Sequence, residues 1–163
     1  MKRIIVLVGP PGVGKSTLVR LAKKQGIYAV DIEDLHNETK KVLSSQLDRN
    51  SDKDVLTKLM NEKISELLNS VPDGISLFGA GGYGGSFPQD LIERILLLPE
   101  KSVAQERFVK RDSEDLEKQK QSQKFDEIYD YFLERSRKGD GVYHRIITSS
   151  GDPNETLLEI LDN

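Results

Sequence analysis

The chain has 163 residues, of which 36% are hydrophobic and 31% charged, with a net charge of −3 and no cysteine. This length predicts one domain with its own core, and the composition is that of a globular protein, which excludes disordered and membrane-embedded classes. The absence of cysteine excludes disulfides and thiolate metal sites, and the net charge offers no general attraction to nucleic acid or anionic lipid.

The first predicted element is a strand over residues 3–8, which contains the apolar run IIVLV. A continuous run of this kind is typical of a strand buried on both faces of a parallel sheet. The run is too short to span a bilayer, and no signal-peptide cleavage region follows it. We therefore expect a cytoplasmic protein.

The segment GPPGVGKST joins this strand to a predicted helix over residues 16–24, which ends at Gly26. It satisfies the pattern G-x-x-x-x-G-K-[ST] between a strand and a helix, which is the context that the pattern requires. Backbone amides of such a loop bind phosphate oxygens, the lysine reaches the β- and γ-phosphates, and the serine ligates Mg²⁺. We predict that the protein binds ATP and Mg²⁺. The predicted nucleotide-binding residues of the loop are Gly9, Pro10, Pro11, Gly12, Val13, Gly14, Lys15, Ser16 and Thr17.

Strands and helices alternate along the rest of the chain. Further strands are predicted at residues 27–32, 73–78, 94–99 and 143–149. Further helices are predicted at 33–47, at 51–71, and from Pro153 with Asp152 as its cap. This alternation predicts an α/β fold, with three layers around a five-stranded parallel sheet.

The most polar part of the chain lies between the last two predicted strands, at residues 110–141. It carries no strand pattern, and we predict two helices joined by a mobile segment near residues 112–124. A solvated helical hairpin would account for the composition. We expect a single domain over residues 1–163, in which residues 112–138 form a helical lid.

The motifs of the chain resemble those of the small P-loop kinases, the group that includes shikimate, gluconate and nucleoside monophosphate kinases. The resemblance is strongest at the glycine loop and continues in DIEDLH, residues 31–36, which is similar to the D-x-D of shikimate kinases and the GDDLH of gluconate kinases. It implies a P-loop NTPase fold and an ATP-dependent phosphotransferase whose acceptor is a small-molecule hydroxyl, such as that of a sugar acid or a cyclic acid. Asn37 stands where gluconate kinases carry proline.

In that group, one acidic residue after the second strand belongs to the shell of Mg²⁺, and another orients or deprotonates the acceptor hydroxyl. The resemblance therefore assigns Asp31, together with Ser16, to the metal, and Glu33 or Asp34 to the acceptor. A hydroxyl must lose its proton as it attacks phosphorus, so the chemistry needs such a group. The alternative is that these acids only cap the following helix.

The segment FGAGGYGG resembles the glycine-rich turn with which shikimate kinases hold their substrate. This resemblance assigns substrate binding to Gly79, Gly81 and Gly82, beside Asp34. Tyr83 departs from the shikimate-kinase pattern. A flexible surface loop is the alternative.

Four arginines complete the predicted site. Arg107 and Arg111 resemble the R-x-x-x-R that opens the lid of adenylate kinases, which implies that Arg107 stacks on adenine and Arg111 contacts phosphate. Arg135 and Arg137, at the far end of the predicted lid, are assigned to the transferring phosphate and to the substrate; solvated arginines are the alternative. The residues assigned to catalysis are Lys15, Asp31, Glu33, Asp34, Arg111 and Arg135.

Several alternatives stay open. A nucleoside monophosphate kinase would want arginines between the second and third strands, where only Arg49 is available. A nucleotide-binding regulatory NTPase shares the loop, although no Walker B acid ends the third or fourth strand. A polynucleotide kinase would want a basic track that the chain lacks. The acceptor, the choice between ATP and GTP, the oligomeric state (monomer or dimer) and the retention of activity are left open.

Overall fold

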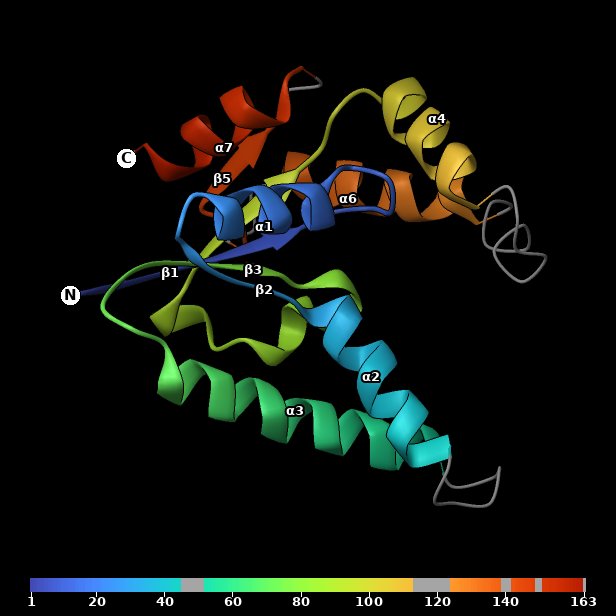
Figure 1. Cartoon of the computed structure of the whole chain (residues 1–163). Coiled ribbons are helices and arrows are strands. Elements are labelled where there is room, and N and C mark those ends of the chain that lie inside the picture. Colours follow the sequence, from blue (N-terminus) through green and yellow to red (C-terminus); the bar gives the residue numbers. More distant parts are fainter. Residues whose placement is uncertain (45–51, 113–123, 139–141, 149–150, 163) are drawn as a thin grey trace.

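The computed structural model describes residues 1–44, 52–112, 124–138, 142–148 and 151–162 (Figure 1). Its strands form one parallel sheet in the order β2-β3-β1-β4-β5. The strands are β1 (Lys2–Val8), β2 (Tyr28–Asp31), β3 (Gly74–Gly79), β4 (Glu93–Leu97) and β5 (Arg145–Ile147). The α/β fold with a five-stranded parallel sheet, predicted from the sequence, is confirmed.

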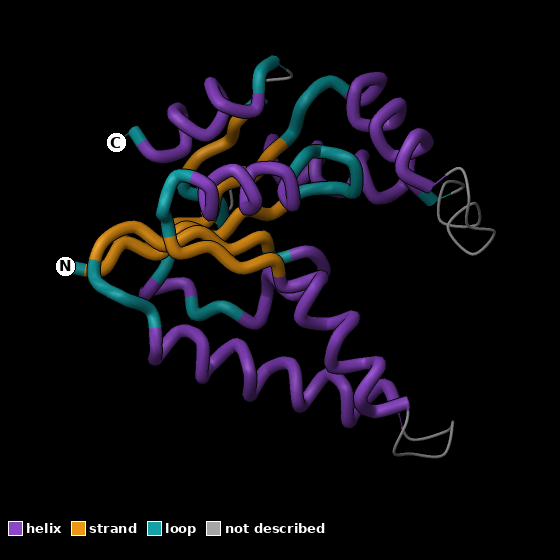
Figure 2. Tube along the Cα trace, viewed as in Figure 1, coloured by secondary structure: helices purple, strands orange, loops and turns teal. Residues whose placement is uncertain are grey.

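Helices cover both faces of this sheet. The helices are α1 (Lys15–Lys24), α2 (Ile32–Ser44), α3 (Asp52–Ser70), α4 (Lys101–Asp112), α6 (Phe125–Lys138) and α7 (Pro153–Leu161), with short 3₁₀ helices η1 (Gly81–Ser86) and η2 (Gln89–Leu91). Figure 2 shows α1 and α7 on one side of the sheet and α3 on the other, which gives the three predicted layers. The segment between α4 and α6, predicted to be mobile, lies largely outside the described residues.

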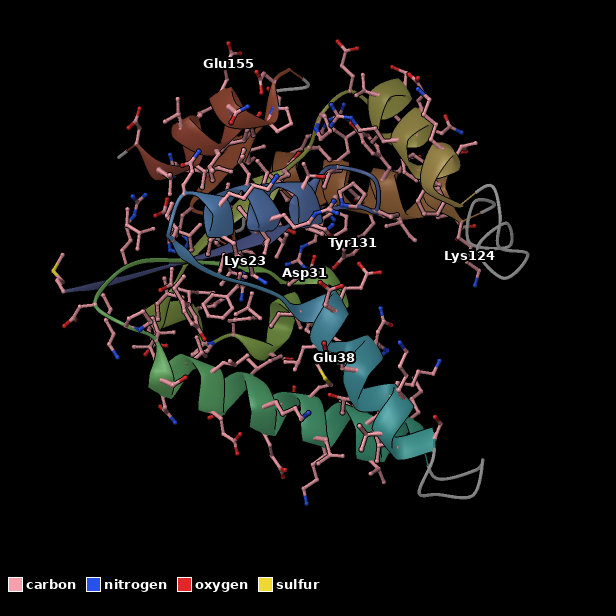
Figure 3. The ribbon with its side chains drawn as sticks, viewed as in Figure 1. Lys23, Asp31, Glu38, Lys124, Tyr131 and Glu155 are labelled. Carbon is pink, nitrogen blue, oxygen red and sulfur yellow. The ribbon has the colours of Figure 1, made fainter. Side chains whose placement is uncertain are left out.

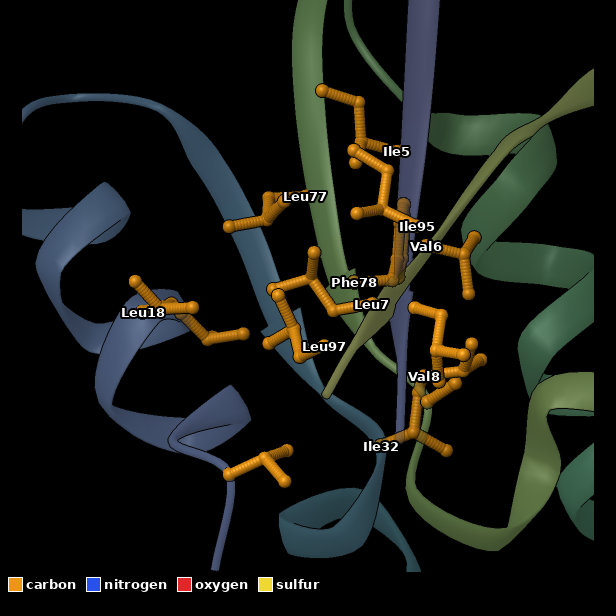
Figure 4. Packing of buried hydrophobic residues seen from close by; sticks show 14 of the residues in the cluster. Ile5, Val6, Leu7, Val8, Leu18, Ile32, Leu77, Phe78, Ile95 and Leu97 are labelled. Atoms are coloured by element: carbon orange, nitrogen blue, oxygen red, sulfur yellow. The ribbon is translucent and has the colours of Figure 1, made fainter. Parts of the chain in front are cut away.

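The core lies on both faces of β1, the central strand. Ile5, Val6 and Leu7 are each 0% exposed, although successive side chains of a strand point to opposite faces. Figure 4 shows how these residues pack with side chains of the neighbouring strands and with Leu18 of α1. The uninterrupted apolar run therefore predicts the position of the strand correctly, because only a central strand buries both faces.

Helix α1 ends as the sequence predicts. The N–H of Gly26, at φ 80°, donates to the carbonyl of Lys23 (3.1 Å), and that of Ile27 donates to the carbonyl of Ala22 (3.0 Å). These two bonds form a Schellman motif, which needs a left-handed residue and therefore favours glycine. The turn starts the chain back toward the sheet at β2.

The last strand is shorter than predicted. We expected residues 143–149, whereas β5 comprises Arg145–Ile147. Its partners are Ile95, Leu96 and Leu97 of β4, at the edge of the sheet. An edge strand extends only as far as its single neighbour offers partners, and the sequence alone does not reveal that length.

Candidate nucleotide and acceptor site

A cleft of about 1000 Å³ lies at the carboxyl ends of the strands. Its walls come from the glycine loop and α1, the start of α2, the glycine turn at η1, the helices α4 and α6, and the start of α7. In a parallel sheet all strands end at the same edge, so residues that follow different strands gather there. Figure 3 shows one of them, Asp31, between α1 and the start of α2.

The glycine loop forms the floor of one half of the cleft. Gly14 precedes α1 with φ 97°, and no side chain caps the helix. The amides at the N-terminus of α1 therefore lie at a site suited to an anion. Lys15, which also lines the cleft, donates from Nζ to the carbonyl oxygens of Gly9 (2.8 Å) and Pro10 (2.9 Å).

Two loop glycines allow a close approach of backbone to backbone. A Cβ on Gly9 would lie 2.4 Å from the carbonyl oxygen of Leu97 in β4, and one on Gly12 would lie 2.4 Å from that of Ala104 in α4. Contacts this short are not tolerated, so both positions require glycine. The loop is thus held against β4 and α4 as well as against its own lysine.

The carboxyl group of Asp31 ends β2 at the cleft wall. Its side chain is 7% exposed, and its Oδ1 accepts a hydrogen bond from the N–H of Glu33 (3.0 Å). Asp31 therefore caps the start of α2, as the alternative interpretation predicted, and it also lines the cleft. Glu33 and Asp34 are exposed residues of the first turn of α2, and both line the cleft.

Ser16 and Asp31 offer a hydroxyl and a carboxylate on the same cleft, and Mg²⁺ prefers oxygen ligands of this type. The described residues contain no group of three His, Cys, Asp or Glu side chains that could enclose a metal. Mg²⁺ in nucleotide sites keeps several waters and takes phosphate oxygens as ligands, so one or two protein oxygens suffice. The donor set therefore fits the predicted metal.

The glycine turn forms the opposite wall of the cleft. Gly81 and Gly82 line the cleft, with Gly81 at φ 52°. Gly79 is buried instead, where a Cβ would lie 3.2 Å from Cγ2 of Val19. Tyr83 also lines the cleft, and its hydroxyl lies 2.6 Å from Nδ1 of His36.

A buried arginine supports this turn from the sheet. Arg94 of β4 is 6% exposed, and its Nη2 donates to the carbonyls of Gly84 (2.9 Å) and Phe87 (3.1 Å). Its Nε is buried without a hydrogen-bond partner. This role is not predictable from the sequence, because a charged residue at the end of an apolar strand is expected at the surface until the neighbours of the strand are known.

No family model matches the chain, and no curated protein matches it in sequence. Solved structures do match. The shikimate kinase from Acinetobacter baumannii, in complex with shikimate, superposes with a TM-score of 0.68 at 20% identity, over 99% of this chain and 92% of that one. The shikimate kinase from Bacteroides thetaiotaomicron gives 0.64 at 16% identity, over 97% and 96%. A gluconokinase from Sinorhizobium meliloti gives 0.56 at 16% identity, over 98% and 89%.

The chain has the fold of small P-loop kinases. The superpositions cover nearly the whole chain, so the resemblance predicted from the motifs is confirmed for the fold. At these identities the likeness concerns the fold alone, and the chemistry must be argued from the residues.

Of the four predicted arginines, only some have side chains that the structure describes, and these differ in whether they line the cleft. Arg107 lines the cleft, with Nη1 3.9 Å from the position of a Cβ on Gly14. Arg111 is in α4, and its side chain lies outside the described part of the structure. Arg135 and Arg137 lie on α6 and do not line the cleft; Arg135 donates to the hydroxyl of Tyr131 (2.8 Å). The roles of these four arginines and the lid stay predictions.

The fold also brings residues of α6 and of the start of α7 to the cleft. Ile128 and Phe132 of α6 line it, and so do Thr156 and two residues at the start of α7, Gly151 and Pro153. Asp152, the predicted cap of α7, accepts from the N–H of Asn154 (2.8 Å). Helical periodicity marks Ile128 and Phe132 as apolar positions but does not reveal which cavity they face.

No helix in the described ranges has both the length and the apolar character that crossing a membrane would require.

Proposed function

We propose that the protein is an ATP-dependent phosphotransferase that moves the γ-phosphoryl group of Mg-ATP to a hydroxyl group of a small molecule. The observation that carries this proposal is the cleft itself, which joins the glycine loop to the acidic first turn of α2. A phosphate-binding floor next to carboxylates that can take a proton is the arrangement that phosphoryl transfer to a hydroxyl needs.

In the proposed reaction, the acceptor oxygen forms a bond to the γ-phosphorus. The bond between this phosphorus and the bridging oxygen breaks, and ADP leaves with that electron pair. The proton of the hydroxyl passes to a carboxylate, for which Asp34 and Glu33 are the candidates. Both side chains are exposed to the cleft, whereas Asp31 is buried and already accepts a hydrogen bond. This difference supports the assignment of Asp31 to the metal shell.

The loop stabilises the charge that develops during transfer. Its amides and the Lys15 ammonium are fixed donors beside the phosphates, which is the type of electrostatic stabilisation that lowers such barriers most. Lys15 exchanges its carbonyl partners at Gly9 and Pro10 for phosphate oxygens when ATP binds. Ser16 and Asp31 would hold Mg²⁺, which supplies charge neutralisation at the β- and γ-oxygens.

The test is ADP release from Mg-ATP, measured over a panel of polyols, hydroxy acids and nucleoside monophosphates. We expect one acceptor class to raise the rate, and Lys15→Ala to lower that rate at least about 100-fold. Lys24→Ala is the matched control, because this exposed lysine lies at the other end of α1 and does not line the cleft. Thermal unfolding of both variants separates lost chemistry from lost folding.

Slow ATP loss that depends on Lys15 but responds to no acceptor would contradict the proposal. It would favour the alternative that the same loop supports, a nucleotide-binding regulatory NTPase. Stimulation by nucleoside monophosphates alone would favour the nucleoside monophosphate kinase.

A further inference from the structure

Two side chains that are 47 residues apart in the sequence meet in the acceptor half of the cleft. Nδ1 of His36, on α2, lies 2.6 Å from the hydroxyl of Tyr83, in η1, and their ring centroids are 5.6 Å apart. The pair joins the acidic first turn of α2 to the glycine turn. It therefore ties together the two walls between which an acceptor would lie.

The pair presents hydrogen-bonding groups to that space. Burial raises the pKa of Tyr83, so the phenol keeps its proton at neutral pH. When a neutral imidazole carries its proton on Nε2, the phenol donates to Nδ1 of His36, which leaves the tyrosine oxygen as an acceptor and Nε2–H as a donor. In the other tautomer Nδ1–H donates to the tyrosine oxygen, and the phenol O–H and Nε2 are the donor and the acceptor. A ligand with hydroxyl groups can use both, since a hydroxyl donates and accepts.

The surroundings hold the pair in place. The N–H of Tyr83 donates to the carbonyl of Ala80 (2.9 Å), and the buried Arg94 holds the turn at Gly84 and Phe87. On the side of α2, the hydroxyl of Thr39 accepts from Nζ of Lys63 in α3 (3.0 Å), which anchors the helix that carries His36. A binding group that is fixed before the ligand arrives loses little entropy on binding.

Three carboxylates line the cleft beside the pair. Asp31, Glu33 and Asp34 line the same half of the cleft as His36 and Tyr83. Carboxylates accept hydrogen bonds from hydroxyl or ammonium groups and repel an anionic group held nearby. Among the described residues, the cations that line the cleft are Lys15 and Arg107, beside the glycine loop, and Arg20 and Lys23, on α1. Lys40 and Lys53 share a second hollow with His36.

We propose that His36 and Tyr83 form the acceptor-recognition pair of this site, and that the acceptor is a polyhydroxy compound without an anionic group. This inference rests on the proposed function, since it names the substrate class of the same cleft. It departs from the sugar acid or cyclic acid that the sequence motifs favoured. Tyr83 and His36 are specificity-determining residues here, because they contact the acceptor and not the γ-phosphoryl group.

Binding tests the inference without turnover. The full protein, saturated with Mg²⁺ and a non-hydrolysable ATP analogue, is titrated by calorimetry with D-gluconate, D-glucitol and D-glucamine. These probes share one polyol chain and end in a carboxylate, a hydroxymethyl and an aminomethyl group. We expect glucitol or glucamine to bind at least about tenfold more tightly than gluconate. Tighter binding of gluconate, equal binding of all three, or no binding of any would overturn the inference.

Tyr83→Phe then tests the pair, because it removes one hydroxyl and keeps the ring. We expect it to weaken the preferred probe about fivefold and to leave the affinity for the ATP analogue unchanged. Tyr28→Phe is the matched control, since Tyr28 packs against Phe78 in β2 and β3, away from the cleft. Equal effects of the two substitutions would overturn the role of the pair.

The two proposals fail in different ways. If the probes bind with the expected preference but no phosphoryl transfer depends on Lys15, the proposed kinase activity is wrong and the ligand class stands. If Lys15-dependent transfer occurs to gluconate or shikimate in preference to the uncharged polyols, the kinase stands and this inference is overturned.

Discussion

The two ends of the sheet are built on opposite principles. At the amino ends of the strands, Glu93 lies between two arginines: its Oε2 accepts from Arg3 (2.8 Å) and its Oε1 from Arg145 (2.8 Å). Both arginines also donate to carbonyl oxygens at the C-terminus of α7, among them those of Leu161 (2.7 Å) and Asp162 (3.0 Å). This end pairs its charges with one another, whereas the carboxyl end directs carboxylates, glycines and a lysine into a cleft.

The difference separates stability from function. Paired charges at the amino end hold the last helix on the sheet, and the negative end of that helix favours the two guanidinium groups. At the carboxyl end, polar groups face a cavity and keep hydrogen-bonding capacity for a ligand. Substitutions at the two ends should therefore separate into those that change stability alone and those that also change ligand binding.

Gly12→Ala should have the largest effect, because it changes the shape of the glycine loop. A Cβ there meets the carbonyl oxygen of Ala104 at 2.4 Å, at a residue with φ 81°. We expect a loss of about 3 kcal/mol in the free energy of unfolding, and at least about tenfold weaker nucleotide binding. Urea unfolding and titration with a fluorescent ATP analogue measure the two effects.

Gly26→Ala is the matched control for that substitution. Gly26 has nearly the same φ, 80°, but nothing lies within 4 Å of a Cβ placed on it. It carries the conformational strain without the clash, so we expect a loss of about 1 kcal/mol and unchanged nucleotide binding. Equal losses in the free energy of unfolding for the two variants would mean that backbone strain, and not the close approach to α4, explains why position 12 requires glycine.

Glu93→Gln should lower stability and leave the cleft unchanged. It keeps the shape of the side chain but removes the charge between two arginines that are 22% and 29% exposed. We expect a loss of about 2 kcal/mol, or about 6 °C in melting temperature, with kcat within about twofold of wild type. Differential scanning calorimetry and the ADP-release assay provide the two measurements.

An exposed ion pair provides the comparison for Glu93. Glu106 pairs with Lys110 one turn along α4 (2.7 Å), and both side chains are mostly exposed. Glu106→Gln should leave the melting temperature within experimental error of wild type. A fall in activity for Glu93→Gln without a fall in stability would contradict the proposal that the amino end of the sheet serves stability and the carboxyl end serves ligand binding.

The sequence predicts those structural features of the two ends of the sheet that depend on local patterns. The glycine loop, the end of α1 at Gly26 and the cap of α7 at Asp152 all depend on residues within a few positions of one another, and each was predicted correctly. Strand β1 was recognisable because burial on both faces leaves an uninterrupted apolar run.

The parts that depend on distant residues were not predictable. Arg3 and Glu93 are 90 residues apart, and they meet because β4 pairs with β1 in a register that no local pattern fixes. The bond between His36 and Tyr83 likewise requires the end of β3 to lie beside α2. Motifs therefore located the loop and the acids, while the sheet topology decided which other side chains join them.

Asp152→Ala should lower stability less than Gly12→Ala or Glu93→Gln. It tests the end of α7 that lies at the cleft, whereas Arg3 and Arg145 hold the other end. Asp152 accepts from the backbone and side-chain N–H groups of Asn154, and these bonds lower its pKa. Because the pKa is lower in the folded state, the cap stabilises the protein above the ordinary pKa of about 3.8, and its contribution is lost as the pH falls through the folded-state value. We expect Asp152→Ala to lower the melting temperature by about 2 °C at pH 7, and this difference to shrink below pH 3.8.

Glu66→Ala, at an exposed position within α3, is the control. A difference from wild type that stays constant down to pH 3 would show that the loss does not come from the charged cap, and that α7 is held chiefly by its arginine end.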